Sequence, residues 1–262
     1  MIKNIKNIVK LLIYPLVFVI GQFLIQYTFI AIFNNKEKAN FSNAEFLKYI
    51  KTDEYMTKLN NYINEKTFVI ILIIMIIFIP LFYKCYKKYR IKNNFEFKNV
   101  FLPIILGITI SLIYNITLYN LNNFVNFTNV FELSSLPLLV QVISSGVCGP
   151  IIEELIFRGI IYNKLKKSNK PMTAIILTSL IFGIIHFNVI ECIYAFGVSF
   201  IFIYLYEKYK TLKAPIIMHM SLNITIILIL PLIMKGFIIF NLYLLITSII
   251  VLLILRPHIN KY

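Results

Sequence analysis

Six polar or ionisable side chains interrupt the long apolar segments of this sequence, and their types could do chemistry. They are Glu153, Glu154, Arg158, His186, His219 and Asn223. A charged side chain at the centre of an isolated membrane-spanning helix costs at least about 2.5–3.5 kcal/mol. Charged residues found there are therefore candidates for a functional role. Carboxylates and imidazoles are the usual groups that move protons to and from a reacting water. The sequence therefore indicates proton-transfer chemistry in apolar surroundings.

The segment Pro150–Arg158 separates its charges by helical geometry. At about 100° per residue, Glu154 and Arg158 project to nearly the same side of a helix and can pair. Glu153 points about a quarter turn away, so it can face other helices, where a carboxylate without a local cation suits general-base work. The alternative for Glu154 and Arg158 is a purely structural pair, because this spacing needs no catalytic reason.

Two further apolar segments hold the histidines and the asparagine. Phe182 and His186 share one helical face, and His219 and Asn223 share another. A histidine and an asparagine one turn apart can donate two hydrogen bonds to one oxygen, as an oxyanion site requires. The alternatives are a histidine satisfied within the core and a polar contact that joins two helices.

Helices of membrane-spanning length must position these residues. Hydrophobic residues make up 59% of the chain and charged residues 14%, against about 45–50% and about 25% in soluble domains. A helix needs about 20 apolar residues to cross a bilayer. We therefore expect one domain over 1–262, an all-α polytopic membrane bundle of eight spans at 11–33, 67–83, 100–119, 136–162, 171–187, 189–206, 214–234 and 237–255.

The cations cluster in alternate connections between these spans. Short cytoplasmic loops are enriched in Lys and Arg, so both termini are predicted to be cytoplasmic. The net charge of +15 then reflects membrane orientation, and no nucleic-acid partner is expected. The wealth of Ile, Lys and Asn favours a bacterial cell membrane. In the connection 34–66, Ser42 and Glu45 predict a capping box, and apolar residues at roughly helical spacing predict an amphipathic helix on the outer surface, namely Phe46, Ile50, Leu59 and Ile63. The alternative is a partly ordered loop.

The motifs resemble those of a known family. Glu-Glu-x-x-x-Arg at Glu153–Arg158, Phe-x-x-x-His ending at His186 and His-x-x-x-Asn at His219 and Asn223 are similar, in type and order, to the motifs of the CAAX-protease and bacteriocin-processing family, also called the Abi family. The resemblance covers about residues 135–235. It implies an intramembrane endopeptidase that acts on membrane-associated proteins or peptides in the lipid bilayer.

The resemblance also implies what each residue does. It assigns water activation to Glu153 and His186, oxyanion stabilisation to His219 and Asn223, and organisation of the site to Glu154 and Arg158. Glu153, His186 and His219 could instead supply three ligands of a catalytic divalent metal such as zinc, with water in the fourth position. The family is described both with and without a metal, so the cofactor stays open, as does prenylation of the substrates.

Depth along the helices constrains this grouping. At about 1.5 Å per residue from the expected cytoplasmic ends, Glu153 lies about 14 Å deep, His186 about 22 Å and His219 about 8 Å. Their convergence requires tilted helices, a fifth span that begins outside the bilayer, or a kink at the Gly146, Gly149 and Pro150 cluster.

Two other functions are compatible with these residues. Intramembrane Glu and His also mark ion paths, so an ion-coupled or proton-coupled transporter is one alternative. That alternative predicts repeated half-structures, which the sequence lacks. The other is a catalytically silent membrane scaffold or immunity factor. The sequence indicates no oligomeric state.

Overall fold

The protein, seen here as a computed structural model, is described over residues 9–91, 95–125, 136–186, 188–234 and 245–253. All secondary structure in these ranges is helical, which confirms the all-α class. The elements are α2 (Ile13–Lys38), α3 (Asn43–Tyr49), α4 (Asp53–Tyr86), η1 (Lys87–Tyr89), η2 (Phe97–Val100), α5 (Phe101–Val125), α6 (Leu138–Gln141), η3 (Val142–Cys148), α7 (Gly149–Glu154), η4 (Leu155–Tyr162), α8 (Asn163–Ser168), α9 (Pro171–Ile184), α10 (Val189–Tyr209) and α11 (Lys213–Met234).

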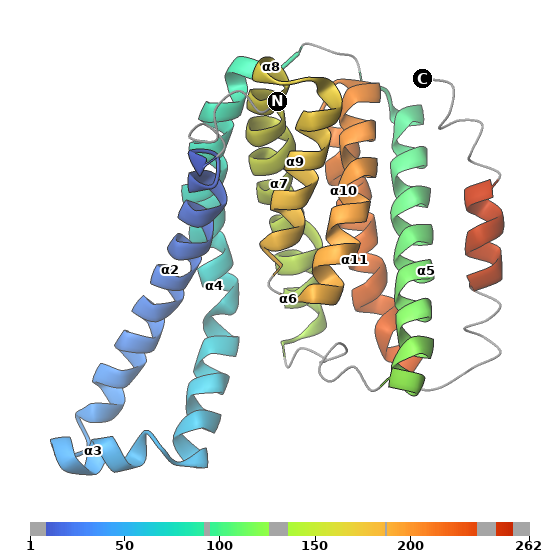
Figure 1. The fold of residues 1–262 in the computed structure, drawn as a ribbon. Coiled ribbons are helices and arrows are strands. Elements are labelled where there is room, and N and C mark those ends of the chain that lie inside the picture. Colours follow the sequence, from blue (N-terminus) through green and yellow to red (C-terminus); the bar gives the residue numbers. More distant parts are fainter. Residues whose placement is uncertain (1–8, 92–94, 126–135, 187, 235–244, 254–262) are drawn as a thin grey trace.

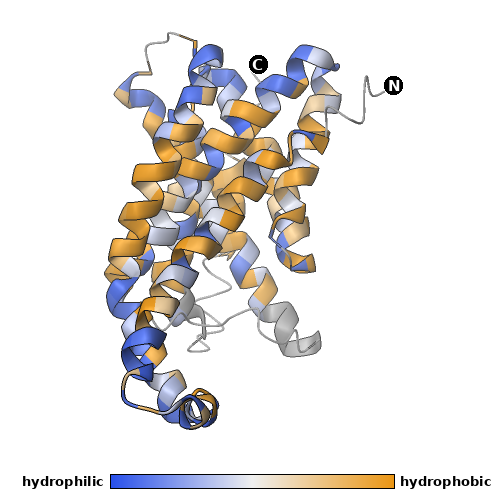
Figure 2. Ribbon diagram, turned by 90° about the vertical axis from the view of Figure 1, so that its left-hand side faces the viewer, coloured by the Kyte–Doolittle hydropathy of each residue, from blue (hydrophilic) through white to orange (hydrophobic). Residues whose placement is uncertain are grey.

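Several of these helices can cross a membrane. Length and composition suffice in five segments: Ile13–Lys38, Asp53–Tyr89, Phe97–Tyr119, Leu138–Ser168 and Val189–Tyr209. Two shorter apolar helices overlap the predicted spans 171–187 and 214–234. The predicted span 237–255 lies largely outside the described residues, although 245–253 are helical. Figure 2 shows a broad hydrophobic band between hydrophilic ends. The membrane bundle is confirmed, and the count of eight spans stays a prediction.

At one side of the bundle, α2 and α4 form a long hairpin with α3 at its tip (Figure 1). The predicted capping box is confirmed, because Ser42 Oγ accepts the Glu45 backbone N–H and the Glu45 carboxylate accepts the Ser42 backbone N–H. The expected amphipathic helix is divided, however. The helix α3 ends at Tyr49, and Thr52 caps the start of α4, which continues without a break to Tyr86.

An aromatic cluster at this tip accounts for the apolar spacing that predicted one helix. Phe33 of α2, Tyr49 of α3 and Tyr55 of α4 are buried together. The partly buried residues packed around them are Phe46, Ile50, Leu59 and Tyr62. The apolar positions therefore belong to two helices that share one small core.

The remaining helices pack side by side as the core of the bundle (Figure 1). The backbones of α5 and α11 approach closely, since a Cβ on Gly107 would lie 2.4 Å from the Met218 carbonyl oxygen, and glycine at this position avoids that clash. The lysine-bearing α8 lies at the end of the bundle opposite α3 (Figure 1). Which side of the membrane this end faces stays a prediction.

Candidate active site

Glu153 and Glu154 end α7, which lies between the π-helical segments η3 and η4. At the end of η3 the Gly149 N–H donates to the Ser144 carbonyl, five residues back. Pro150 follows and has no N–H to donate, so the α-helical ladder cannot run through it. At the predicted kink the structure thus has a π-helical segment, a rare feature that is frequent at functional sites.

Glu154 and Arg158 pair as their spacing predicts. Arg158 Nη1 lies 2.9 Å from Glu154 Oε1, and both side chains are fully buried. The guanidinium also donates from Nη2 to Ser199 Oγ at 2.7 Å. Its carbon lies 4.4 Å from the Phe182 ring centroid and 4.7 Å from that of Phe202. Aromatic rings and charge-assisted hydrogen bonds replace part of the water that the buried cation has lost, and Arg158 Nε is left without a hydrogen-bond partner among the described residues.

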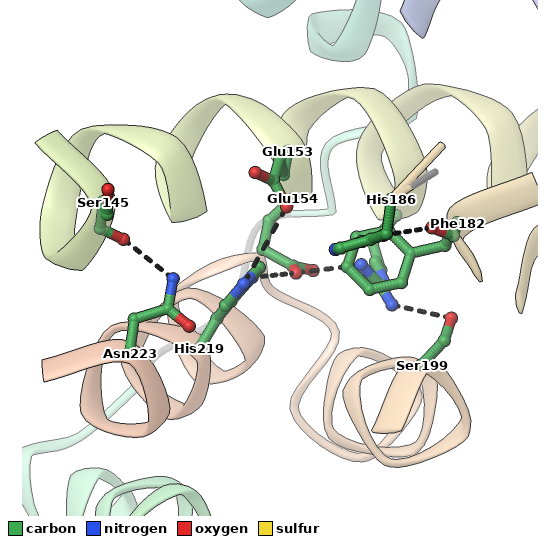
Figure 3. A network of polar contacts seen from close by, with 9 residues as sticks. Ser145, Glu153, Glu154, Phe182, His186, Ser199, His219 and Asn223 are labelled. Atoms are coloured by element: carbon green, nitrogen blue, oxygen red, sulfur yellow. Dashed lines mark hydrogen bonds and ion pairs between the residues drawn. The ribbon is translucent and has the colours of Figure 1, made fainter. Parts of the chain in front are cut away.

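His219 joins this pair to the second carboxylate (Figure 3). Its Nδ1 lies 3.0 Å from Glu154 Oε1, and its Nε2 lies 3.8 Å from Glu153 Oε2. Because a carboxylate only accepts hydrogen bonds when ionised, Nδ1 is assigned the proton. The ring also stacks on Phe202, with centroids 4.7 Å apart. The Nε2 atom is thereby aimed toward Glu153.

Glu153 faces a cavity of about 280 Å³ and keeps 24% of its side chain exposed. The cavity is bounded by the hairpin on one side and by η3, α7 and α11 on the other. Its lining residues are Phe18, Gln22, Ile71, Ile74, Ser144, Ser145, Cys148, Gly149, Ile152, Glu153 and Asn223. The two adjacent glutamates therefore differ as the helical phase predicts, since one is paired within the core and the other faces an accessible space.

Asn223 lies one turn beyond His219 on the same face of α11, but the two side chains contact different partners. The Asn223 Nδ2 group donates to the Ser145 carbonyl at 2.7 Å (Figure 3). A carboxamide has two N–H donors and one acceptor oxygen, so this bond uses only part of its capacity. Asn223 therefore stands at the cavity wall with a further donor available.

His186 follows the end of α9 and is tied to its own helix. Its Nδ1 lies 2.8 Å from the Phe182 carbonyl oxygen, which accepts, so Nε2 is the nitrogen with the free lone pair. The rings of His186 and Phe182 lie 5.0 Å apart, and those of Phe182 and His219 lie 6.1 Å apart. His186 is thus separated from His219 by the Phe182 ring, which lies near both imidazoles.

The three residues considered as zinc ligands do not fit one centre in this arrangement. Glu153 and His219 approach to 3.8 Å, but no hydrogen bond or ion pair joins His186 to either within the described residues. Over the same ranges, no group of three His, Cys, Asp or Glu side chains is placed to hold an ion. Among the described residues, Glu153 and His219 thus come together as a pair and not as part of a three-ligand centre.

Sequence reasoning missed Ser199, Phe202 and Gln22. Ser199 and Phe202 contact Arg158 from α10, more than forty residues away in sequence, and a serine or phenylalanine in an apolar helix has no distinctive signal. Gln22 lines the cavity from α2. Its signal was available, because a carboxamide in an apolar span is unusual.

Comparisons with known proteins support the resemblance. Residues 135–225 match the family described as "Type II CAAX prenyl endopeptidase Rce1-like". The chain is 32% identical over 96 residues to a Bacillus subtilis (strain 168) protein named "Putative membrane peptidase YdiL". That match covers 37% of this chain and 38% of the relative. No solved structure gives a match. The expected family resemblance is confirmed for the part of the chain that holds Glu153, His219 and their neighbours.

Proposed function

We propose, on the premise that residues 135–225 have the Rce1-like endopeptidase pattern, that this protein is an intramembrane endopeptidase of membrane-associated proteins or peptides. One observation supports the proposal most directly. Glu153 stands on a cavity wall with its carboxylate 3.8 Å from His219 Nε2, while Glu154, the adjacent acid, is neutralised by Arg158. A site in which Glu154 is paired with a cation and Glu153 is open to the cavity suits general-base chemistry by Glu153.

In this mechanism Glu153 takes a proton from a water in the cavity. The water oxygen attacks the carbonyl carbon of the scissile peptide bond, and the carbonyl oxygen becomes an oxyanion. Glu153 then returns the proton to the leaving nitrogen as the C–N bond breaks. The family resemblance assigns His186 to the same water, and because the Phe182 carbonyl holds its Nδ1, the nitrogen that could accept a hydrogen bond from water is Nε2.

His219 and Asn223 stabilise the oxyanion. Because Glu154 holds Nδ1, the His219 atom that would donate to the oxyanion is Nε2, on the side of Glu153, and this role requires a proton on Nε2. The second N–H of Asn223 supplies the other donor.

The test is cleavage of a fluorogenic single-span substrate by the purified chain in nanodiscs, with matched prenylated and unprenylated versions. Glu153→Gln should slow cleavage by about 100- to 10,000-fold, because it removes the general base and keeps the side-chain shape. Glu54→Gln is the control, since this acid on α4 is 66% exposed. Cleavage by Glu153→Gln at the rate of the parent protein would rule out the mechanism.

Asn223→Ala tests the oxyanion assignment in the same assay. Loss of one donor that acts on the transition state should lower kcat by about 100- to 1,000-fold and leave KM little changed. A raised KM with an unchanged kcat would assign Asn223 to substrate binding. The transporter alternative would be favoured if the parent protein cleaved no substrate but carried a proton flux across the nanodisc or vesicle membrane that depended on Glu153.

A further inference from the structure

The cavity in front of Glu153 has a wall that comes from outside residues 135–225, the part of the chain that matches the endopeptidase family. Phe18 and Gln22 of α2 line it together with two isoleucines of α4. Gln22 is the side chain of this hairpin wall that can both donate and accept hydrogen bonds. A polar group thus faces the candidate site from the N-terminal hairpin.

The position of Gln22 is fixed by the crossing of α2 and α4. A Cβ on the preceding residue, Gly21, would lie 2.2 Å from Phe78 Cζ, so the two helices are in direct contact there. The Phe18 ring packs edge-on against Phe78 at 5.3 Å, and Phe78 stacks with Phe82 at 5.8 Å. These buried rings hold α2 beside α4 at the height of the cavity.

Gln22 has no structural task that accounts for its polarity. Polar side chains in membrane helices commonly hydrogen-bond a neighbouring helix. The Gln22 carboxamide is only half-buried and makes no hydrogen bond to any part of the chain that the structure describes. Its donor and its acceptor are both left for whatever enters the cavity.

A carboxamide is complementary to a backbone peptide group, which presents one N–H and one C=O. Within an α-helix each N–H is occupied by the carbonyl four residues earlier. Gln22 can therefore make both hydrogen bonds of such a pair only with a segment whose backbone is locally unwound or extended. Asn223, which donates to the Ser145 carbonyl, lies on the core side of the same cavity.

We propose that Gln22 is a substrate-binding residue whose carboxamide hydrogen-bonds the backbone of an unwound segment of the substrate and so sets which peptide bond faces Glu153. The inference rests on the proposed endopeptidase function and adds a substrate class to it. Substrates are membrane-associated segments that expose backbone amides at the cleavage point, with little demand on side-chain identity at the position that Gln22 contacts.

The experiment measures binding separately from turnover. Peptide substrates are titrated into the full chain carrying Glu153→Gln in nanodiscs, with and without Gln22→Leu. A parallel peptide series replaces single backbone N–H groups by ester oxygens. Gln22→Leu should weaken binding about three- to tenfold, the effect of one net hydrogen bond. In the protein that keeps Gln22, an ester at one position of the peptide should weaken binding by a similar factor. In the Gln22→Leu protein, the same ester should weaken binding no further.

Gln26→Leu is the matched control, because it is the same change one turn along α2, where the side chain is exposed and outside the cavity. It should leave the dissociation constant unchanged. The inference would be overturned if Gln22→Leu and Gln26→Leu weakened binding equally, or if the effects of the ester and of Gln22→Leu simply added. It would also be overturned if no peptide bound. If peptides bind in a Gln22-dependent way but the parent protein never cleaves them, the proposed function fails while the binding role stands.

Discussion

Two glutamate–cation pairs with the same four-residue spacing lie in the two halves of this molecule. In the hairpin, Lys58 Nζ lies 2.8 Å from Glu54, and the side chains are 50% and 66% exposed. In the core, Arg158 Nη1 lies 2.9 Å from Glu154, and both are fully buried. The distances barely differ. The surroundings must therefore decide what each pair contributes.

The core pair has partners that the hairpin pair lacks. Ser199, His219 and two aromatic rings surround the Glu154–Arg158 pair. Lys58 Nζ lies 5.6 Å from the centroid of one ring, that of Tyr49, and water and salt screen the exposed charges of Glu54 and Lys58. Spacing in sequence shows that a pair can form, and burial turns one pair into a fixed part of a site.

The largest expected effect comes from breaking both pairs in the same way. Arg158→Met leaves the Glu154 charge buried without its cation, which should destabilise the fold by about 3–5 kcal/mol and abolish cleavage. Lys58→Met should leave the melting temperature and the activity unchanged, because solvent replaces the lost contact. Thermal unfolding in detergent measures both. Similar melting temperatures for the two variants would show that burial is not what separates the pairs.

Glycine contacts extend the comparison to backbone packing. Gly107→Ala in the core places a Cβ 2.4 Å from the Met218 carbonyl oxygen, and backbone cannot move aside without shifting α11. We expect destabilisation of about 1–3 kcal/mol. Gly21→Ala in the hairpin places its Cβ 2.2 Å from Phe78 Cζ, so a side chain and not backbone has to shift, and the substitution gains helix propensity. Its melting temperature should fall by less, and the reverse order would contradict the packing described here.

An effect of similar size should separate two buried serines of the core. Ser199→Ala removes the acceptor of Arg158 Nη2, and a buried donor left unsatisfied costs about 1–3 kcal/mol. Ser179→Ala removes an equally buried hydroxyl that has no hydrogen-bond partner among the described residues, so its stability should be unchanged or slightly raised. Thermal unfolding of the two variants in the same detergent measures the difference.

The smallest expected effect is at the hairpin tip. Hydrogen bonds from the Ser42 hydroxyl and backbone hold the pKa of the exposed Glu45 carboxyl below its usual value. A lowered pKa adds stability above the unfolded-state pKa, and that stability is lost as pH falls through the folded-state value. Ser42→Ala should therefore raise the Glu45 pKa toward its usual value and reduce this pH dependence. NMR titration of labelled glutamate measures the change, and an unmoved pKa would mean that Ser42 does not set it.

Local features of this molecule were predictable from the sequence. The Glu154–Arg158 pair and the capping box at Ser42 depend on residues three or four apart, and helical geometry alone brings such residues together. The all-α membrane class followed from the length of the apolar segments. The separate position of Glu153 followed from helical phase.

Features that depend on distant contacts were not predictable. Ser199 meets Arg158 across 41 residues, and no local pattern selects it from other serines. The apolar spacing around Leu59 predicted one surface helix, whereas α4 continues through that residue and packs on Phe33 of α2. His186 was grouped with Glu153 through family motifs, and the structure holds it on its own helix through the Phe182 carbonyl.

The π-helical segment η3 has a consequence for chain length. Each of its hydrogen bonds spans one residue more than an α-helical bond, so the segment behaves as a stored insertion of one residue. Deleting one residue within η3 would be absorbed by the loss of this insertion, so the helix on either side would keep its register while the residues inside η3 would turn relative to Glu153. Ser144 and Ser145 would leave the cavity wall, and Asn223 would lose the carbonyl that anchors it. All six motif residues would survive such a deletion, yet the site would be taken apart.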